Sequence, residues 1–458
     1  PFYRVIESVN VDGHTFTGEW RAVKGSAYFE SPKLYKENGF KEKEEAQKLI
    51  AVLKEGTSPL TCRIVSIEKK KEKKNPPLLF NLAELQNECS KRFKISPDET
   101  LRIVQELYEK KLVTYPRTDA RVLSTAVSKE ITKNLNGLSK YQMAAPYMQD
   151  ILHYGAYKNL AKTRYVNDKQ ITDHYAIIPT GQGLSALNSV SATAHHVYDV
   201  IVRRFLSIFY PSAVYQKVAL VTQIGKEQFF SNFRVLAEEG YLKVAGVPVL
   251  KKNANGNDAE GDGSDNNVDL DAAFFASIQK LKKGDILDVK SLDIKEGETS
   301  PPKRYNSGSM ILAMENAGQL IEDEELRAQI KGSGIGTSAT RAEILKKLFN
   351  IKYLALNKKT QVITPTLLGE MIYDVVLNSI RSLLNPELTA SWEKGLNYVA
   401  EGEITSDEYM TKLDHFIVSR TNGVLGLNNQ YQLRSCYDRA AAFYKKETKG
   451  RASKGKKE

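Results

Sequence analysis

Strand-like segments stand on both sides of a long helical stretch, and this order limits the folds open to the chain. Near the start, TFTGEW and TCRIVSIE alternate or carry β-branched residues, which is typical of strands. Later in the chain, KVALVTQIG and EQFFSNFRVLAEEG predict a hairpin, and KGDILDVKSLDI predicts a further strand. The chain between these groups is helical in pattern. A β-rich domain interrupted by an inserted helical domain explains this order.

We therefore expect a mixed α and β protein built from four consecutive parts. These are residues 1–77, the first part of a β-rich domain; 78–180, an inserted helical domain; 181–300, the second β-rich part; and 301–458, a helical C-terminal domain with a basic tail. EKKKEKKNPP, which begins at residue 68, is expected to break the first strand pattern. The stretch 251–271 is rich in Asn, Asp and Gly but does not meet the calcium-loop pattern, so it predicts a disordered insertion.

The net charge of +11 and the pI of about 9.1 favour a polyanionic partner, most often nucleic acid. Part of the excess comes from lysine runs at 68–74 and 445–458, which are usually only solvated, so charge alone leaves both interpretations open. No window approaches the ~18 apolar residues of a membrane span. The three cysteines show no CxxC spacing, which argues against a zinc ribbon or a disulfide framework and fits a reducing cytoplasm.

The segment LVTYPRTD places a tyrosine, an arginine and an aspartate on alternate positions. Pro116 biases Tyr115 away from the helical region, so residues 115, 117 and 119 of an extended segment would point to one side. Arg117 can hold a phosphate through two hydrogen bonds, and Asp119 can orient that guanidinium or a neighbouring one. A phenol beside a clamped phosphate is suited to attack a phosphodiester. A buried tyrosine with a surface Arg–Asp pair remains the alternative.

The helix before this segment has a clear beginning. Ser96 can cap it, Pro97 suits the first helical position, and Glu99 completes a capping box, so we expect a helix over residues 96–111. The helix is expected to lead directly into the extended tyrosine segment.

Two further motifs point to phosphate chemistry. His174 lies in DHYAIIPT, where it is either a structural histidine or, as imidazolium, a partner for an anionic phosphate. GSGIGTSATRAEIL combines three glycines with hydroxyls at the start of a helix, which makes an anion site from backbone N–H groups. An ordinary capped helix is the alternative. No GK[ST] follows, so nucleotide hydrolysis is not indicated.

These motifs together resemble the type IA DNA topoisomerases, particularly the topoisomerase III branch. LVTYPRTD is similar to the active-site segment of that family, DHYAIIPT to its AHHAIIPT, and GSGIGTSATRAEIL to its GIGTPATRAxII. PPKRYNSGSMILAMENAG and NPELTASWEKGLNYVAEGEI match as well, in the family's order. The resemblance covers residues 1 to about 420. It implies an arch-shaped fold with a β-rich arch or hinge, a helical domain carrying the tyrosine, and a helical DNA-binding base.

The resemblance also implies roles for individual residues. Catalysis would fall to Tyr115, Arg117 and His174. The implied DNA-binding residues are Gln105, Glu109, Thr118, Asp119, Gly336, Thr337, Thr340 and Arg341. The complete enzyme would cut one DNA strand through a 5′-phosphotyrosyl link, pass a strand and reseal the break without ATP.

The sequence departs from the family pattern at its beginning. The family's Toprim domain, which holds magnesium through acidic residues, and its catalytic lysine have no counterpart here, so we expect no metal ligands in this chain and impaired chemistry from the chain alone. Magnesium is expected only for the complete enzyme. The alternative function is a non-catalytic clamp for single-stranded DNA, with a basic groove and stacking aromatic residues.

The expected partner is DNA with single-stranded segments, and no membrane association is expected. The resemblance is consistent with a monomer in the bacterial cytoplasm, associated with the nucleoid. A bacterial source or a mobile element suits the topoisomerase III character.

Overall fold

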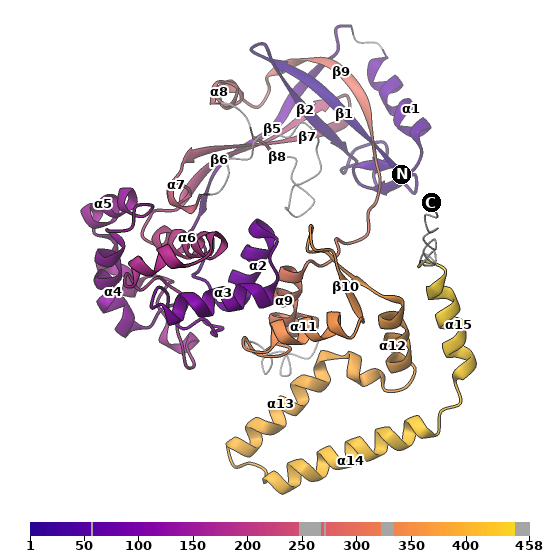
Figure 1. Ribbon diagram of the computed structural model, residues 1–458. Coiled ribbons are helices and arrows are strands. Elements are labelled where there is room, and N and C mark those ends of the chain that lie inside the picture. Colours follow the sequence, from indigo (N-terminus) through magenta and orange to yellow (C-terminus); the bar gives the residue numbers. More distant parts are fainter. Residues whose placement is uncertain (56–57, 247–266, 270–271, 322–333, 445–458) are drawn as a thin grey trace, which may run out of the picture. The chain divides into compact units, whose positions relative to one another are not determined.

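The computed structural model describes residues 1–55, 58–246, 267–269, 272–321 and 334–444. They form two compact units, each built from two separate stretches of the chain (Figure 1). The first unit comprises residues 1–77 and 207–302, and the second comprises 78–206 and 303–458. Residues 181–206, expected in the second β-rich part, lie in the second unit, because most of this stretch belongs to short 3₁₀ turns and to α6 (Ala192–Ser207).

The first unit is organised around one large antiparallel sheet. Its strands are β1 (Phe2–Val11), β2 (His14–Arg21), β3 (Leu34–Lys36), β4 (Gly39–Phe40), β5 (Thr61–Lys74), β6 (Ala213–Ile224), β7 (Glu227–Glu238), β8 (Asn267–Asp269) and β9 (Ile286–Gly297). The strand order is β2-β7-β6-β5-β9-β1-β4-β3, and β1 also pairs with β2, so six of the strands close into a ring. Chain segments from both sides of the helical insertion therefore share this sheet, as the order of strand-like segments predicts.

In the described part of this unit, three helices accompany the sheet: α1 (Lys43–Lys54), α7 (Leu242–Ala245) and α8 (Ala272–Lys280). The core of the unit is apolar and aromatic. Trp20 stacks on Phe40 with ring centroids 4.8 Å apart, and its indole N–H donates to Glu227 Oε2 at 2.7 Å. A buried indole keeps its place in such a core because its polar N–H has a partner.

The expectation that EKKKEKK ends the strand pattern is wrong. β5 continues through this run to Lys74 and pairs with β6 over its whole second half, for example Lys69 with Val218. One acid of the run pairs across the sheet, since Glu72 Oε2 lies 3.1 Å from Lys217 Nζ and 3.5 Å from Arg234 Nη2. Ladder hydrogen bonds and cross-strand charge pairs allow a lysine-rich strand where side-chain alternation alone indicates none.

Most of the predicted insertion at 251–271 lies outside the described residues, as does the tail at 445–458. The described exception is β8, which pairs in parallel with β7. The predicted disorder of this stretch therefore stays a prediction.

A glutamate is buried inside the ring. Glu7 on β1 has no exposed surface, and its Oε1 accepts a hydrogen bond from the Thr222 hydroxyl. Gly18 lies opposite it on β2, and a Cβ there would lie 2.7 Å from Glu7 Oε1, so a larger residue would displace the carboxylate. Burial raises the pKa of Glu7 from 4.5 to about 7, although the Thr222 hydrogen bond lowers it.

The Glu7→Gln protein should be more stable than the natural chain above pH 7, by up to about 3 kcal/mol, because 1 pKa unit corresponds to ~1.36 kcal/mol. Between pH 4.5 and 7 the unfolded chain loses the Glu7 proton while the folded chain keeps it, so stability falls as pH rises through this window. Glutamine cannot ionise and keeps an acceptor for Thr222. Denaturant unfolding at pH 5 and pH 8 tests this. Equal stability differences at both pH values would contradict it.

The second unit is mainly helical. Its first stretch contains α2 (Leu82–Phe93), α3 (Pro97–Glu109), α4 (Thr125–Leu138), α5 (Ala145–Tyr154) and α6. Short 3₁₀ helices lie at Ala156–Lys162, Asp168–Gln170 and Leu184–Ser189. The predicted helix over 96–111 is confirmed as α3, and the Ser96 hydroxyl accepts from the Glu99 N–H at 3.2 Å.

The second stretch of this unit contains α9 (Ser307–Glu315), α11 (Arg341–Asn350), α12 (Leu367–Leu377), α13 (Pro386–Ala400), α14 (Ser406–Leu425) and α15 (Gln430–Ala441), with 3₁₀ turns at Ala317–Leu320 and Arg381–Leu384. The expectation from the sequence that this stretch is helical throughout is wrong, because β10 (Leu354–Leu356) and β11 (Ile363–Pro365) form a small hairpin. Among the described residues, no helix is long and apolar enough to cross a membrane.

Helices from the two stretches pack closely on one another. Gly308 at the start of α9 lies against α2, where a Cβ would come within 2.6 Å of the Asn87 Cα. The Ser307 hydroxyl lies 3.0 Å from the Ser90 hydroxyl and donates to Gln361 Oε1 at 2.8 Å. This packing holds the helices before residue 206 and those after residue 303 in one unit.

Candidate active site

The tyrosine segment follows α3 and runs between two other stretches of the second unit. The Thr114 N–H donates to the Ile178 carbonyl at 3.0 Å, and its hydroxyl donates to the Ala176 carbonyl at 3.0 Å. On the other side, the Leu82 N–H donates to the Thr118 carbonyl at 3.1 Å. The DHYAIIPT stretch and the start of α2 therefore fix the backbone on both sides of Tyr115.

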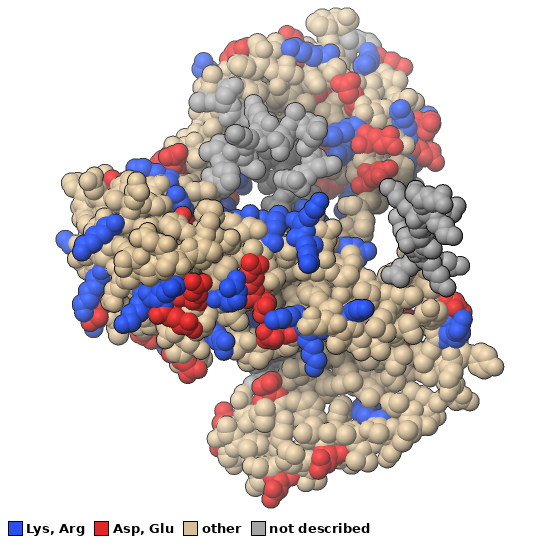
Figure 2. Space-filling model, in the orientation of Figure 1, with Lys and Arg blue, Asp and Glu red and all other residues tan. Residues whose placement is uncertain are grey.

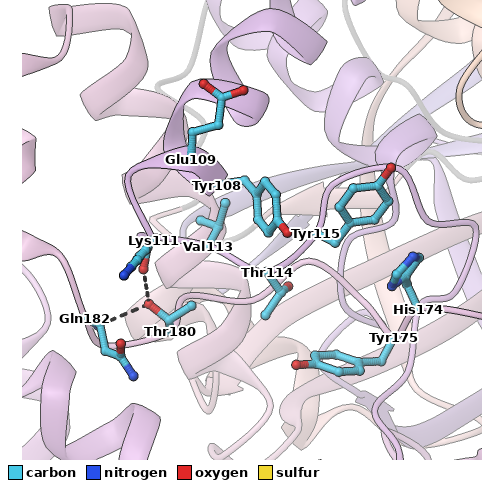
Figure 3. A pocket seen from close by; sticks show the side chains of 10 residues that line it. All are labelled: Tyr108, Glu109, Lys111, Val113, Thr114, Tyr115, His174, Tyr175, Thr180 and Gln182. Atoms are coloured by element: carbon cyan, nitrogen blue, oxygen red, sulfur yellow. Dashed lines mark hydrogen bonds between the residues drawn. The ribbon is translucent and has the colours of Figure 1, made fainter.

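Tyr115 lies between two other rings (Figure 3). Its ring centroid is 4.3 Å from that of His174 and 5.4 Å from that of Tyr108, which meets it edge-on. All three rings line a pocket of about 460 Å³. Tyr115 is half-buried, and no hydrogen bond of its hydroxyl is found within the described part of the chain. The structure thus brings together the tyrosine and the histidine that the motifs single out.

The segment after Tyr115 is not straight. The Thr118 N–H donates to the Pro116 carbonyl at 3.0 Å, which closes a three-residue turn around Arg117. The expectation that residues 115, 117 and 119 point to one side fails here, because the rule of alternation requires an extended backbone. Arg117 is exposed, and no ion pair or hydrogen bond of its guanidinium is found among the residues described. It is accessible to a phosphate.

Thr118 connects the tyrosine and histidine segments. Its side chain is 4 % exposed, and its hydroxyl donates to the His174 carbonyl at 2.9 Å while accepting from the Ala120 N–H at 3.1 Å. The sequence suggested a DNA contact for Thr118. The geometry gives it a positioning role, since it fixes His174 relative to Tyr115.

Asp119 forms an ion pair with Arg341, at 2.8 Å between Oδ1 and Nη1. Arg341 begins α11, is 1 % exposed, and also lies 4.0 Å from Glu315 on α9. The Asn81 amide donates both to the Asp119 carbonyl at 3.1 Å and to Glu315 Oε1 at 2.6 Å. Burial raises the pKa of the Glu315 carboxyl, and the Arg341 guanidinium opposes this rise.

This network changes the interpretation of the glycine-rich motif. Arg341 was expected in an anion site, but in the structure its guanidinium is turned inward to Asp119 and away from solvent. Its charge is used to hold α11 against the tyrosine segment, because a buried guanidinium needs a carboxylate partner.

The loop before α11 is shaped by its glycines. Gly334 has φ +64°, and a Cβ there would lie 2.3 Å from the Met314 carbonyl oxygen. Gly336 has φ +70°. The Thr337 N–H donates to the Thr340 hydroxyl at 2.9 Å, so the two predicted DNA-binding threonines bond to each other at an exposed corner. Gly336, Thr337 and Thr340 are accessible, and their DNA contacts stay predictions.

Gln105 and Glu109 lie on the last turns of α3. The Gln105 amide donates to Glu109 Oε1 at 3.2 Å, and Glu109 lines the pocket beside Tyr115. The two predicted residues are therefore neighbours at the edge of this pocket.

The described residues contain no group of three or more His, Cys, Asp or Glu side chains that could hold a metal ion. The nearest candidates, Asp119 and Glu315, are engaged by Arg341 and Asn81. This donor set does not fit a magnesium ion. Magnesium binds carboxylate oxygens and water, but these two carboxylates already contact a guanidinium and an amide.

The motif analysis missed several residues that line the pocket, among them Tyr108, Lys111 and Tyr175. Tyr108 and Tyr175 are adjacent in sequence to Glu109 and His174, which were singled out, whereas Lys111 is not adjacent to such a residue. The two tyrosines flank Thr114 in Figure 3, and Lys111 lies at the other end of the pocket from His174. The sequence signal that could have indicated the two tyrosines is that Tyr108 precedes Glu109 and Tyr175 follows His174.

Comparisons with known proteins agree with these motifs. The profile of the family described as DNA topoisomerase matches residues 2–411. DNA topoisomerase 3 of Bacillus licheniformis is 33% identical over 373 residues, which cover 81% of this chain and 48% of that protein. DNA topoisomerase 3 of Bacillus subtilis is 34% identical over 347 residues, covering 75% of this chain and 44% of that protein. The chain thus spans about half the length of these curated relatives.

The fold agrees as well. Full-length topoisomerase I from Thermotoga maritima superimposes with a TM-score of 0.59 at 21% identity, covering 91% of this chain and 58% of that structure. The structural likeness supports the fold, and the family profile and the sequence identities support the lineage. This chain belongs to the type IA DNA topoisomerase family.

Proposed function

We propose that this chain is the part of a topoisomerase III-like enzyme that carries the nucleophile for transient cleavage of one DNA strand. The observation that carries the proposal is the placement of Tyr115 between His174 and Tyr108, with an exposed Arg117 two residues away whose guanidinium has no partner within the described part of the chain. Family membership adds the substrate class, which is DNA.

In the proposed reaction the Tyr115 oxygen attacks a backbone phosphorus, and the phosphorus–O3′ bond breaks. The phenol loses its proton, and the departing 3′ oxygen gains one. Arg117 is suited to stabilise the charge that develops on the phosphate oxygens. The 5′ phosphate stays on Tyr115 until the same steps run in reverse. Because one phosphodiester is exchanged for another, resealing needs no ATP.

Magnesium remains a prediction for the complete enzyme, with ligands outside the residues described here. A role in the bacterial cytoplasm, at the nucleoid, and a monomeric state also remain predictions that accompany the proposed function.

The helices α12 to α15 support the idea that further protein belongs to the active enzyme. Among their described residues, Ala390 is the only buried one. Large apolar side chains are exposed, including Leu368, Tyr373, Leu396, Ile417, Val418 and Leu425. On the face shown in Figure 2, the charges over α13 and α14 are mostly acidic and are separated by uncharged surface. An exposed apolar surface of this extent indicates a contact with protein. We propose that the Toprim domain implied by the resemblance provides it.

The test of the proposed function is a covalent adduct. The chain, supplied with the N-terminal region of a topoisomerase 3 relative, magnesium and a labelled single-stranded oligonucleotide, should give a protein–DNA band that survives denaturant. Tyr115→Phe should abolish the band. Tyr154→Phe, at an exposed tyrosine on α5 of the same unit, should retain it. An adduct with Tyr115→Phe would contradict the assignment.

The chain by itself should bind single-stranded DNA without relaxing a supercoiled plasmid. Binding is expected from the net charge of +11 and from the exposed Arg117 and glycine-rich corner. Phosphate contacts release counterions, so the log–log salt slope should be about −0.7 per contact on a single strand. Oligonucleotide titrations at several salt concentrations measure the binding, and a plasmid relaxation assay with magnesium tests the expected lack of relaxation. Relaxation by this chain alone would show that Tyr115 works with groups not identified here.

The non-catalytic clamp remains the second candidate. It predicts the same salt-dependent binding but no adduct under any supplementation. The adduct assay therefore separates the two functions.

A further inference from the structure

A carboxylate behind the tyrosine segment makes contacts that the proposed chemistry does not use. Glu315 is the last residue of α9, and its side chain is 14 % exposed. Its Oε1 accepts from the Asn81 amide at 2.6 Å and lies 4.0 Å from Arg341 Nη1. The same Asn81 amide donates to the Asp119 carbonyl at 3.1 Å. Glu315 is therefore linked to the tyrosine segment through the side chain of Asn81.

Asn81 also connects this carboxylate to the start of α2. Its side chain is 1 % exposed, and its Oδ1 accepts from the Glu84 N–H at 2.9 Å, which caps the helix. The next residue, Leu82, donates its N–H to the Thr118 carbonyl at 3.1 Å. Two successive carbonyls, those of Thr118 and Asp119, are thus held by two successive residues at the start of α2.

The two carbonyls follow directly on the turn that carries Arg117. The Thr118 N–H donates to the Pro116 carbonyl at 3.0 Å, so this turn ends at the residue whose carbonyl Leu82 holds. A shift of these hydrogen bonds would move the Arg117 guanidinium relative to the phosphate on which it is proposed to act. A misplacement of about 1 Å at a reacting group can cost ~10²-fold in rate.

We propose that Glu315 is a positioning residue for strand cleavage, because its carboxylate holds the Asn81 amide in the orientation that fixes the Arg117 turn. The inference rests on the proposed function, since it assumes cleavage by Tyr115. A hydrogen bond to an ionised acceptor is stronger than one to a neutral acceptor, so the charge of Glu315 determines how firmly Asn81 is held. Glu315 acts through Asn81 and not on the DNA, so its loss should slow cleavage without weakening DNA binding.

The charges that face Glu315 come from the tyrosine segment, α2 and α11. Burial raises the pKa of the Glu315 carboxyl from its ordinary value of 4.5, and the Arg341 guanidinium on α11 opposes this rise. Asp119 raises the pKa, the Asn81 hydrogen bond lowers it, and Glu84 on α2 raises it. Glu315 therefore becomes neutral at a higher pH than an ordinary glutamate, and its hold on Asn81 weakens there.

Glu315→Gln keeps an acceptor for Asn81 and removes the charge. With the supplemented enzyme and saturating oligonucleotide at pH 8, adduct formation should slow by about five- to tenfold, the difference between hydrogen bonds to charged and to neutral acceptors. The Kd for the oligonucleotide should stay unchanged. The ratio of the natural rate to the variant rate should shrink as the pH falls toward 4.5, because protonation also makes the natural side chain neutral. Taking this ratio cancels the titration of Tyr115 and His174, which both proteins share.

Glu130→Gln is the matched control. Glu130 lies on α4 of the same unit, is 67 % exposed and pairs with Lys133 at 3.2 Å. This variant should cleave like the natural chain at every pH. If the natural enzyme formed an adduct and Glu315→Gln formed it equally fast at pH 8, the positioning role would be refuted while the proposed function stood. If the natural enzyme formed no adduct, the proposed function would fail and the inference with it.

A second variant separates positioning from capping. Serine is also a favoured N-cap, so Asn81→Ser keeps the cap of α2 and removes both amide donors. It should slow cleavage as Glu315→Gln does. The double variant should be no slower than Asn81→Ser, because both residues act through one side chain. Additive losses would show that Glu315 does not act through Asn81.

Hydrogen exchange on the full 458-residue chain measures the same contacts without any activity. In Glu315→Gln, peptides that contain the Leu82 or the Thr118 amide should exchange faster than in the natural chain, because their backbone hydrogen bonds open more often. Peptides of α4 should exchange at the same rate in both proteins. Unchanged exchange at Leu82 and Thr118 would overturn the proposal.

Discussion

Replacing Arg117 by alanine should lower the rate of strand cleavage by about 10²- to 10³-fold, the loss typical of removing one donor that stabilises transition-state charge. Arg117 is exposed at a tight turn two residues after the nucleophile, and its guanidinium has no partner among the described residues. The Arg117 guanidinium can therefore bind the phosphate oxygens as negative charge develops on them in the transition state. Rates of adduct formation on saturating oligonucleotide, with the supplemented enzyme, measure this loss.

Oligonucleotide affinity should fall by less than about tenfold in the same variant, because one phosphate contact among several is removed. Arg102→Ala, at an exposed arginine on α3, is the matched control and should cleave normally. Equal losses of cleavage and binding in Arg117→Ala would identify an ordinary binding arginine instead.

Arg341→Ala should lower the free energy of unfolding of the second unit by about 1–3 kcal/mol, because the buried guanidinium is lost while its partner Asp119, 34 % exposed, can be hydrated. Arg341 is 1 % exposed and is held by Asp119 at 2.8 Å. Its loss leaves the buried Glu315 beside Asp119 without a cation, which raises the pKa of Glu315 further. Denaturant unfolding followed by circular dichroism measures the change.

Lys346→Ala provides the comparison on the same helix. Lys346 pairs with Asp98 at 3.1 Å at the protein surface, and such pairs contribute little to stability. If Arg341→Ala unfolded like Lys346→Ala, the network around Asp119 would be incidental to the fold. A loss of stability in Arg341→Ala but not in Lys346→Ala would show that Arg341 holds α11 against the tyrosine segment.

The sequence predicted the elements whose causes are local. The helix beginning at Ser96 and the hairpin of β6 and β7 follow from capping and alternation, and the structure confirms both. The shared sheet of the two β-rich parts followed from the order of the strand-like segments. The lysine run in β5 was missed because its strand form depends on β6, which lies more than a hundred residues away along the chain.

In the site, too, features set by local residues were predicted, and those that depend on distant residues were not. The identities of Tyr115 and His174 came from motifs, and the structure brings their rings together. The pairing of Asp119 with Arg341, across 222 positions, could not be predicted, because each residue alone has several suitable partners. The turn around Arg117 was missed too, since the proline signal describes only the residue before it.

The central claim is that Tyr115 carries the 5′ phosphate of the cut strand. The most direct measurement is mass spectrometry of the denatured adduct after nuclease and protease digestion, from the supplemented enzyme and a single-stranded oligonucleotide. The account predicts a nucleotide attached through its 5′ phosphate to the peptide that contains Tyr115. A nucleotide on any other residue, or one joined through its 3′ phosphate, would contradict it.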